Sequence, residues 1–230
     1  MPESLLSRSE NAMTTTAPAR QIVDQLGDVR IVPVTSFETP EQAHATATAL
    51  MRGGITCIEV TFRTAAAAEC IARVSGINGL LIGAGTLLSP DQVQEAIAAG
   101  AHFGVAPGTN VGVIEAARDS GLPFFPGVAT PSEIERVRSL GISTVKVFPA
   151  GPLGGPAFLK AVAAVYPDVK FMPTGGVDAG SVAEYASAPG VLAVGGSWVA
   201  STSLIREDRY DEIERLAREA RETLSSVARP

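Results

Sequence analysis

The residue with the clearest chemical potential is Lys146, in the run Ser143-Thr144-Val145-Lys146-Val147-Phe148-Pro149. Such a run of β-branched and aromatic residues is typical of a buried strand. The chain has fifteen arginines and only three lysines, so a lysine inside an apolar strand is not a general surface cation. Burying an ammonium group lowers its pKa, and a neutral amine can attack a carbonyl. We therefore predict a Schiff-base lysine; an exposed edge-strand lysine or half of a buried ion pair is the alternative.

A second strand-like run carries both a carboxylate, Glu59, and a guanidinium, Arg63. Strand alternation puts Cys57, Glu59 and Thr61 on one face, and if that face points into a barrel, Glu59 and Arg63 approach the same mouth as Lys146. A carboxylate in an apolar interior suits general acid/base work, and the guanidinium fork suits a substrate carboxylate. The alternative is a Glu59–Arg63 ion pair without a chemical role.

Short apolar runs alternate with helix-like segments along the rest of the chain. Strands are predicted over 31–34, 56–62, 80–82, 101–105, 122–125, 144–148, 169–172 and 191–194. Each is followed by a predicted helix, over 40–52, 65–74, 90–99, 111–120, 131–140, 156–165, 178–187 and 207–226. Repeated strand–helix units imply parallel strands. Eight units in about 200 residues fit a (β/α)8 barrel, the TIM barrel fold, with a doubly wound open sheet as the competing architecture.

The domain organisation is predicted to be simple. Residues 21–230 form a single α/β barrel domain, because no linker divides the alternating pattern. Residues 1–20 are rich in Ser, Thr and Ala and are predicted to be a disordered N-terminal extension.

Polar and glycine residues gather where the predicted strands end, which is where barrels of this type place their chemistry. The last two strands end in Pro173-Thr174-Gly175-Gly176 and Gly195-Gly196-Ser197-Trp198. Without Cβ atoms, these glycines let backbone N–H groups approach an anion, and a following helix N-terminus adds positive charge. We predict a phosphate site here; two ordinary strand–helix turns are the alternative.

Two other strand ends contribute candidate pocket residues. The third strand leaves through Gly83-Ala84-Gly85-Thr86, which presents the Thr86 hydroxyl and lacks the third glycine of a dinucleotide-binding fingerprint. The fourth ends in Ala106-Pro107-Gly108, where Pro107 is a candidate pocket wall.

The composition disfavours several classes of protein. The net charge is −6 with no basic block, which argues against a nucleic-acid partner. No apolar run reaches the length of about 18 residues that a membrane span requires. Two cysteines and two histidines without a close cluster favour a cytoplasmic protein without a disulfide framework or a metal site.

Together these residues resemble the bacterial 2-keto-3-deoxy-6-phosphogluconate (KDPG) aldolases, lyases that form a Schiff base through a lysine. The resemblance runs from about Gln21 to the C-terminal helix. Its motifs are Glu59-Val60-Thr61-Phe62-Arg63-Thr64, Gly83-Ala84-Gly85-Thr86, Pro107-Gly108, Pro126-Gly127, Lys146-Val147-Phe148-Pro149-Ala150, Pro173-Thr174-Gly175-Gly176 and Gly195-Gly196-Ser197-Trp198.

The resemblance implies a role for each matching residue. Lys146 matches the Schiff-base lysine, and Glu59 matches an acid/base that acts through a water. The pyruvate half of the substrate is matched by Arg63, Thr86, Thr174, Pro107 and Phe148. The phosphate is matched by Gly175, Gly176, Gly196 and Ser197. The resemblance also implies a homotrimer that needs no metal or other cofactor.

The predicted function is cleavage of the phosphorylated keto acid KDPG to pyruvate and glyceraldehyde 3-phosphate. Cleavage of 4-hydroxy-2-oxoglutarate (KHG) to pyruvate and glyoxylate is compatible, because it needs only the pyruvate half of the site. The sequence departs from the family pattern after Ala150 and at Ala106, which bears on substrate preference. The alternatives are a galactonate-type aldolase acting on 2-keto-3-deoxy-6-phosphogalactonate, a phosphate-binding barrel isomerase or epimerase that uses Glu59 without an imine, and a non-catalytic sensor.

Overall fold

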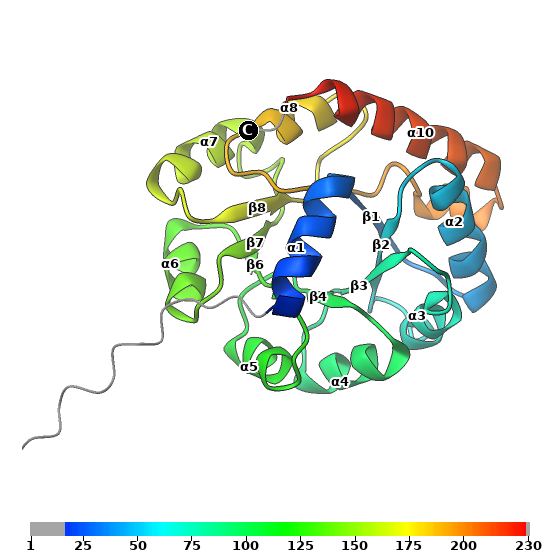
Figure 1. The fold of residues 1–230 in the computed structure, drawn as a ribbon, viewed down its shortest axis with the longest axis horizontal. Coiled ribbons are helices and arrows are strands. Elements are labelled where there is room, and N and C mark those ends of the chain that lie inside the picture. The colour runs from blue at the N-terminus through cyan, green and yellow to red at the C-terminus, as the bar shows by residue number, and fades with distance from the viewer. Residues whose placement is uncertain (1–16, 229–230) are drawn as a thin grey trace, which may run out of the picture.

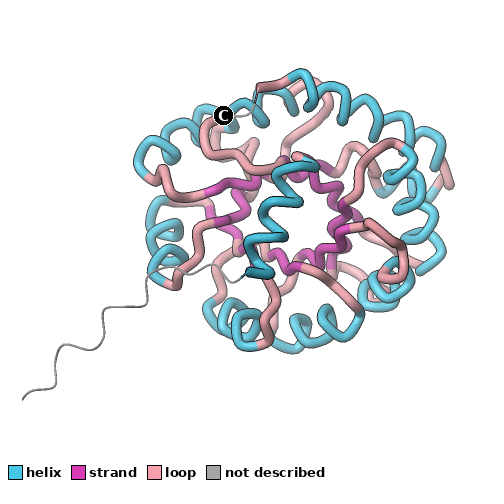
Figure 2. Tube along the Cα trace, in the orientation of Figure 1, coloured by secondary structure: helices cyan, strands magenta, loops and turns pink. Residues whose placement is uncertain are grey.

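Short apolar runs form a ring of parallel strands, with helices on the outside (Figures 1 and 2). The computed structural model describes residues 17–228. The strands are β1 (Ile31–Thr35), β2 (Cys57–Thr61), β3 (Leu81–Gly85), β4 (Phe103–Val105), β5 (Phe124–Phe125), β6 (Gly127–Val128), β7 (Thr144–Val147), β8 (Lys170–Pro173) and β9 (Val194–Gly196).

The strand pairing closes into a barrel. One sheet has the order β5-β4-β3-β2-β1-β9 and the other the order β6-β7-β8. At one junction β5 and β6 are consecutive pieces of one barrel strand on either side of Pro126, and at the other a parallel bridge joins Thr174 to Gly195. The nine strands therefore fill eight barrel positions, which confirms the predicted (β/α)8 barrel and rejects the open sheet.

The fifth barrel strand differs from its prediction over 122–125. It begins at Phe124 and continues beyond Pro126 to Val128. Proline has no backbone N–H for the ladder, so the strand is interrupted there, although the Pro126 carbonyl still accepts a 2.9 Å hydrogen bond from Lys146 N.

The helices are α1 (Ala17–Val29), α2 (Pro40–Arg52), α3 (Ala67–Val74), α4 (Pro90–Ala99), α5 (Val111–Asp119), α6 (Pro131–Ser139), α7 (Gly155–Val165), α8 (Val182–Ser187), α9 (Thr202–Arg206) and α10 (Tyr210–Ser226). Three of them begin with a hydroxyl cap followed by proline, at Thr39, Ser89 and Thr130. These caps satisfy the first free N–H groups and fix where each helix leaves its strand.

Two helical predictions need correction. The helix predicted from residue 178 begins at Val182, because the Asp178 carboxylate accepts hydrogen bonds from Gly180 N and Ser181 N and holds a turn. The helix predicted from residue 207 begins at Tyr210, beyond Asp208 in the left-handed region at φ 52°, and the short α9 precedes it. The expected helix N-termini therefore do not follow the glycine pairs directly.

Helix α1 is the third difference. The predicted extension ended at residue 20, but α1 begins at Ala17, so that boundary is wrong. Residues 1–16, on which the rest of the prediction of disorder falls, lie outside the described residues.

Helix α1 lies across the amino-terminal end of the barrel (Figure 2). A cavity of about 640 Å³ beneath it is lined by α1 and by residues that precede the strands, among them Thr56, Leu80, His102 and Pro123. Helix α1 therefore covers the amino-terminal end of the barrel, and the predicted site residues lie toward the opposite end, where the strands have their carboxyl ends.

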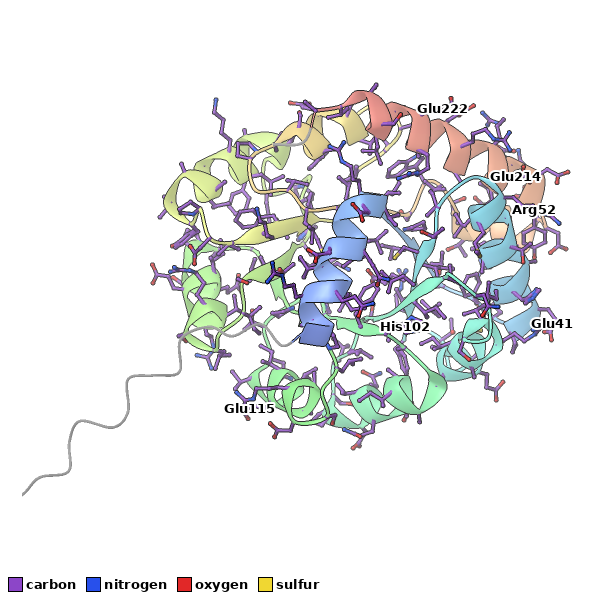
Figure 3. All side chains as sticks on the ribbon, viewed as in Figure 1. Glu41, Arg52, His102, Glu115, Glu214 and Glu222 are labelled. Carbon is purple, nitrogen blue, oxygen red and sulfur yellow. The ribbon has the colours of Figure 1, made fainter. Side chains whose placement is uncertain are left out.

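Charged side chains such as Glu41, Glu115 and Glu222 project from the outer helices (Figure 3). None of the helices within residues 17–228 combines the length and the apolar character that crossing a membrane requires.

Candidate active site

Lys146 and Glu59 meet inside the barrel. Lys146 Nζ lies 3.2 Å from Glu59 Oε1, and their side chains are 6% and 1% exposed. They come from β7 and β2, which are four positions apart around the eight-membered ring. Two strands on opposite sides can make this contact only through the lumen, so both side chains point inward, as predicted.

This contact excludes two of the alternatives left by the sequence, an exposed Lys146 and a Glu59–Arg63 ion pair. Lys146 is not an exposed edge-strand residue, and it is half of a buried ion pair. The partner of Glu59 is Lys146 rather than Arg63, so the Glu59–Arg63 pair is not formed. The same contact permits chemistry, because transfer of one proton from Lys146 to Glu59 yields a neutral amine and a neutral acid in a site shielded from water.

Gly85 makes room for the Glu59 carboxylate. A Cβ at Gly85 would lie 2.7 Å from both Cγ and Cδ of Glu59, well inside van der Waals contact. The Phe148 ring centroid lies 5.6 Å from Lys146 Nζ, within the range of a cation–π contact. A glycine and an aromatic wall thus fix the two ionisable groups.

Arg63 lies just beyond the end of β2 and is exposed. Its Nε donates a 3.0 Å hydrogen bond to Thr61 Oγ1. Arg63 therefore lies at the mouth formed by the carboxyl ends of the strands, which is the position that the sequence predicts for it.

Thr86 and Pro107 follow the ends of β3 and β4. Thr86 has φ 60°, in the left-handed region that is unusual for a β-branched residue. Such conformations are concentrated at ligand-binding and catalytic positions. Pro107 packs its backbone against Gly127, where a Cβ would lie 2.5 Å from Gly108 N, so the wall of β4 directly abuts the strand beside Lys146.

The two glycine pairs lie next to each other at the junction that closes the barrel. Thr174 is paired with Gly195, and a Cβ at Gly195 would lie 3.0 Å from Thr174 Cβ. Gly175 and Gly176 both have positive φ, 90° and 82°. The two glycine-rich loops therefore adjoin each other, and glycine-rich loops of this kind suit an anion.

We call Gly175, Gly176, Gly196 and Ser197 the glycine corner, and the loop after β7 packs against it. Gly151 N donates a 2.8 Å hydrogen bond to Gly175 O, and a Cβ at Gly176 would lie 3.1 Å from Gly151 Cα. A Cβ at Gly175 would lie 3.3 Å from the Phe148 ring. The glycine corner is therefore contiguous with the wall of the lysine site. In this corner Gly176 and Ser197 are exposed, while Gly196 is buried beside Trp198.

The surroundings of Cys57 determine its reactivity. Cys57 is fully buried, and burial, followed by the nearby charge of Glu59, raises the pKa of its thiol far above its usual range. Cys57 is therefore not a thiolate nucleophile. Between residues 17 and 228 no group of three or more His, Cys, Asp or Glu side chains is arranged to hold a metal ion.

Sequence reasoning missed two contributors, Gly85 and Ser36. Gly85 was interpreted only as part of a tight strand exit, whereas it faces Glu59 directly. Ser36 Oγ lies 2.5 Å from Thr61 Oγ1. Its position just after β1 was the available signal, because Arg63, Thr86 and Thr174 likewise follow strand ends.

Comparison with known proteins agrees with this geometry. A family model described as KDPG and KHG aldolase matches residues 22–216. The chain belongs to the KDPG and KHG aldolase family. The match covers every strand of the barrel, so the family assignment applies to the whole catalytic scaffold.

Individual members of the KDPG and KHG aldolase family match over most of their length. The chain is 45% identical over 199 residues to a 2-dehydro-3-deoxy-phosphogluconate aldolase of Treponema pallidum, covering 86% of this chain and 95% of the relative. It is 37% identical over 191 residues to the KHG/KDPG aldolase of Escherichia coli, covering 83% and 90%.

A solved structure of a family member also matches the fold of this chain. The KDPG aldolase of Legionella pneumophila, with pyruvate captured as a covalent carbinolamine intermediate, matches with a TM-score of 0.81 at 37% identity, covering 85% of this chain and 98% of that one. A carbinolamine is the adduct that a primary amine forms with a ketone. Membership of this family favours an aldolase over the isomerase, epimerase and sensor alternatives.

Proposed function

We propose that this protein is a Schiff-base aldolase that cleaves KDPG to pyruvate and glyceraldehyde 3-phosphate. The observation that carries the proposal is the buried contact between Lys146 and Glu59 across the barrel, at the carboxyl ends of the strands. An amine and a carboxylate shielded together from solvent supply a nucleophile and a group that accepts and returns its proton.

The reaction begins at the C2 ketone. Lys146 gives a proton to Glu59 and attacks C2 to form a carbinolamine. Glu59 returns that proton to the carbinolamine hydroxyl, which leaves as water, so a protonated imine and the Glu59 carboxylate remain. Glu59, as carboxylate and directly or through a water, removes the proton of the C4 hydroxyl. The C3–C4 bond breaks, its electron pair moves into the imine, and glyceraldehyde 3-phosphate leaves. The remaining enamine is protonated at C3 and hydrolysed, which releases pyruvate and regenerates Lys146.

The surrounding residues bind the two ends of the substrate. Arg63 and Thr86 receive the carboxylate, since a guanidinium fork and a hydroxyl are the donors that a carboxylate accepts. Pro107, Phe148 and Thr174 form the walls around the keto acid. The 6-phosphate binds the backbone and hydroxyl groups of the glycine corner, Gly175, Gly176, Gly196 and Ser197, which is supported by the contact between the two loops.

The substrate range extends in two directions. Cleavage of KHG to pyruvate and glyoxylate uses only the pyruvate half of the site, and the family description covers both reactions. Rates measured side by side on the gluconate and galactonate epimers at C4 test the preference; a faster galactonate reaction would replace KDPG by its epimer as the substrate.

The assembly and the location are likewise proposals. We propose a homotrimer, as the resemblance implies, which light scattering of the purified protein tests by its mass. Both cysteines are free and buried, which suits a reducing cytoplasm, and cell fractionation tests this location.

The decisive experiment traps the imine. Borohydride reduction in the presence of pyruvate is expected to attach one pyruvate-derived group to Lys146, located by peptide mass spectrometry. The chain offers matched controls, because its other two lysines, Lys160 and Lys170, are exposed. Lys160→Arg and Lys170→Arg should label and turn over normally, whereas Lys146→Arg should do neither. Full activity of Lys146→Arg would overturn the proposal.

A further inference from the structure

We propose that the buried hydroxyl of Thr61 is a positioning residue, which holds the Arg63 guanidinium ready for the carboxylate of the keto acid. The inference rests on the proposed function, in which Arg63 binds that carboxylate. It concerns Thr61 and its partner Ser36, neither of which the reaction described above uses.

The Thr61 hydroxyl is fixed by the main chain of the neighbouring strand. Thr61 is 2% exposed, and its Oγ1 donates a 2.7 Å hydrogen bond to Thr35 O at the end of β1. Thr35 is itself 1% exposed, and its Oγ1 donates a 2.8 Å hydrogen bond back to Glu59 O in β2. The two strands are thus tied at the level of Glu59, so the oxygen of Thr61 has a fixed position relative to the catalytic carboxylate.

Because a hydroxyl has one proton and can accept two hydrogen bonds, the use of that proton on Thr35 O leaves Thr61 Oγ1 as an acceptor. It accepts from Arg63 Nε at 3.0 Å. It also has the Ser36 hydroxyl at 2.5 Å, which must then be the donor of that bond. One buried oxygen therefore takes part in all three hydrogen bonds.

The consequence falls on Arg63, whose side chain is long and exposed. The hydrogen bond at Nε fixes the plane of the guanidinium, since Nε lies in that plane. Within residues 17–228, its terminal nitrogens Nη1 and Nη2 form no hydrogen bond or ion pair, so both remain available to a carboxylate. Ordering this side chain before the ligand arrives removes a cost that binding would otherwise carry.

The test compares pyruvate binding in hydroxyl variants of Thr61. The readout is the pyruvate concentration that gives half-maximal borohydride trapping on Lys146, measured beside the thermal unfolding temperature. Thr61→Val and Thr61→Ala should raise that concentration roughly three- to tenfold, the usual effect of freeing one rotamer-rich side chain. Thr61→Ser, which keeps the hydroxyl, should stay near wild type. Two different hydroxyl-free variants keep the test valid if one of them folds poorly.

A matched control and a double-mutant cycle separate positioning from structure. Thr64 Oγ1 donates a 2.7 Å hydrogen bond to Phe37 O and forms no hydrogen bond with the Arg63 side chain. Thr64→Val therefore removes a similar bond to the main chain near β1, and it should not change pyruvate binding. If Thr61 acts through Arg63, Thr61→Val should have no further effect in an Arg63→Met background. Methyl pyruvate, which lacks the negative charge, should be bound equally by wild type and Thr61→Val.

Several results would overturn the inference. One is that Thr61→Val raises the half-saturating pyruvate concentration equally in the presence and in the absence of Arg63. Another is that Thr64→Val raises it as much as Thr61→Val does. A third is that Thr61→Val lowers the unfolding temperature but leaves pyruvate binding unchanged. Failure of the proposed function is distinguishable, because then wild-type protein itself would show no pyruvate adduct on Lys146, and the role assigned to Thr61 would fall with it.

Discussion

Gly85→Ala is the substitution that tests the geometry of the site most directly. Gly85 ends β3 beside Glu59, and its φ lies outside the left-handed region, so alanine causes no backbone strain there. The added methyl group would lie 2.7 Å from Cγ and Cδ of Glu59, whereas ordinary contacts begin at 3.4 Å. The carboxylate must therefore shift by about 0.7 Å or more if the backbone stays in place.

This shift is large compared with the tolerance of the Lys146–Glu59 contact. At 3.2 Å the contact is close to the outer limit of a hydrogen bond, so a further displacement of this size breaks it. A misplacement of about 1 Å at a catalytic group can reduce the rate about a hundredfold, or about 2.7 kcal/mol in activation free energy. We expect a reduction in kcat of this order for Gly85→Ala.

The assay follows pyruvate release, coupled to lactate dehydrogenase and read as NADH oxidation. Gly76→Ala is the matched control, because a Cβ there meets no atom within 4 Å. Circular dichroism and thermal unfolding establish that both variants fold. If folded Gly85→Ala turns over within twofold of Gly76→Ala, the carboxylate does not need its observed place and the reasoning is wrong.

Three further predictions concern catalysis, stability and pH. Glu59→Gln keeps the shape of the side chain but not its base, so kcat should fall about 10²- to 10⁴-fold while the half-saturating pyruvate concentration changes little; equal losses in both would contradict the acid/base role. Arg30 is 8% exposed and donates hydrogen bonds to carbonyls at the end of α10, including Leu224 O at 2.7 Å. Arg30→Met should therefore lower the free energy of unfolding, measured in urea, by about 3 kcal/mol. A loss below about 1 kcal/mol would refute this prediction. Burial lowers the pKa of His102, whose Nδ1 accepts from Ile82 N, so the folded state binds a proton less readily than the unfolded state and loses stability as the pH falls below about 6.5. The stability advantage of wild type over His102→Leu should therefore shrink between about pH 7.5 and about pH 5, and an advantage independent of pH would contradict the assignment.

Much of the fold could be predicted because its signals are local. A β-branched run such as 144–148 and a capped start such as Ser89-Pro90 depend on neighbours in the sequence, and both elements form nearly as predicted. Helix α1 was not predicted, because its position is fixed by packing across the open end of the barrel rather than by a cap or a stop signal. Residues Leu26 and Val29 become buried only when that end exists.

The candidate site divides in the same way. The residue types and their positions at strand ends were visible in the sequence, and they were sufficient to nominate Lys146, Glu59 and the glycine pairs. The interaction partner of each group was not visible in the sequence. The sequence predicts Arg63 at the mouth near Glu59, but its hydrogen bond to the Thr61 hydroxyl could not be predicted, because β2 ends at Thr61 and alternation no longer applies beyond it.

For this protein the sequence alone determined the order of eight strand–helix units and the burial of a lysine within one of them, because hydrophobic period and turn chemistry act over a few residues. The tertiary structure alone decided that Lys146 faces Glu59 at 3.2 Å, since 87 positions separate them in the chain and they meet only where the closed ring of strands brings opposite walls together.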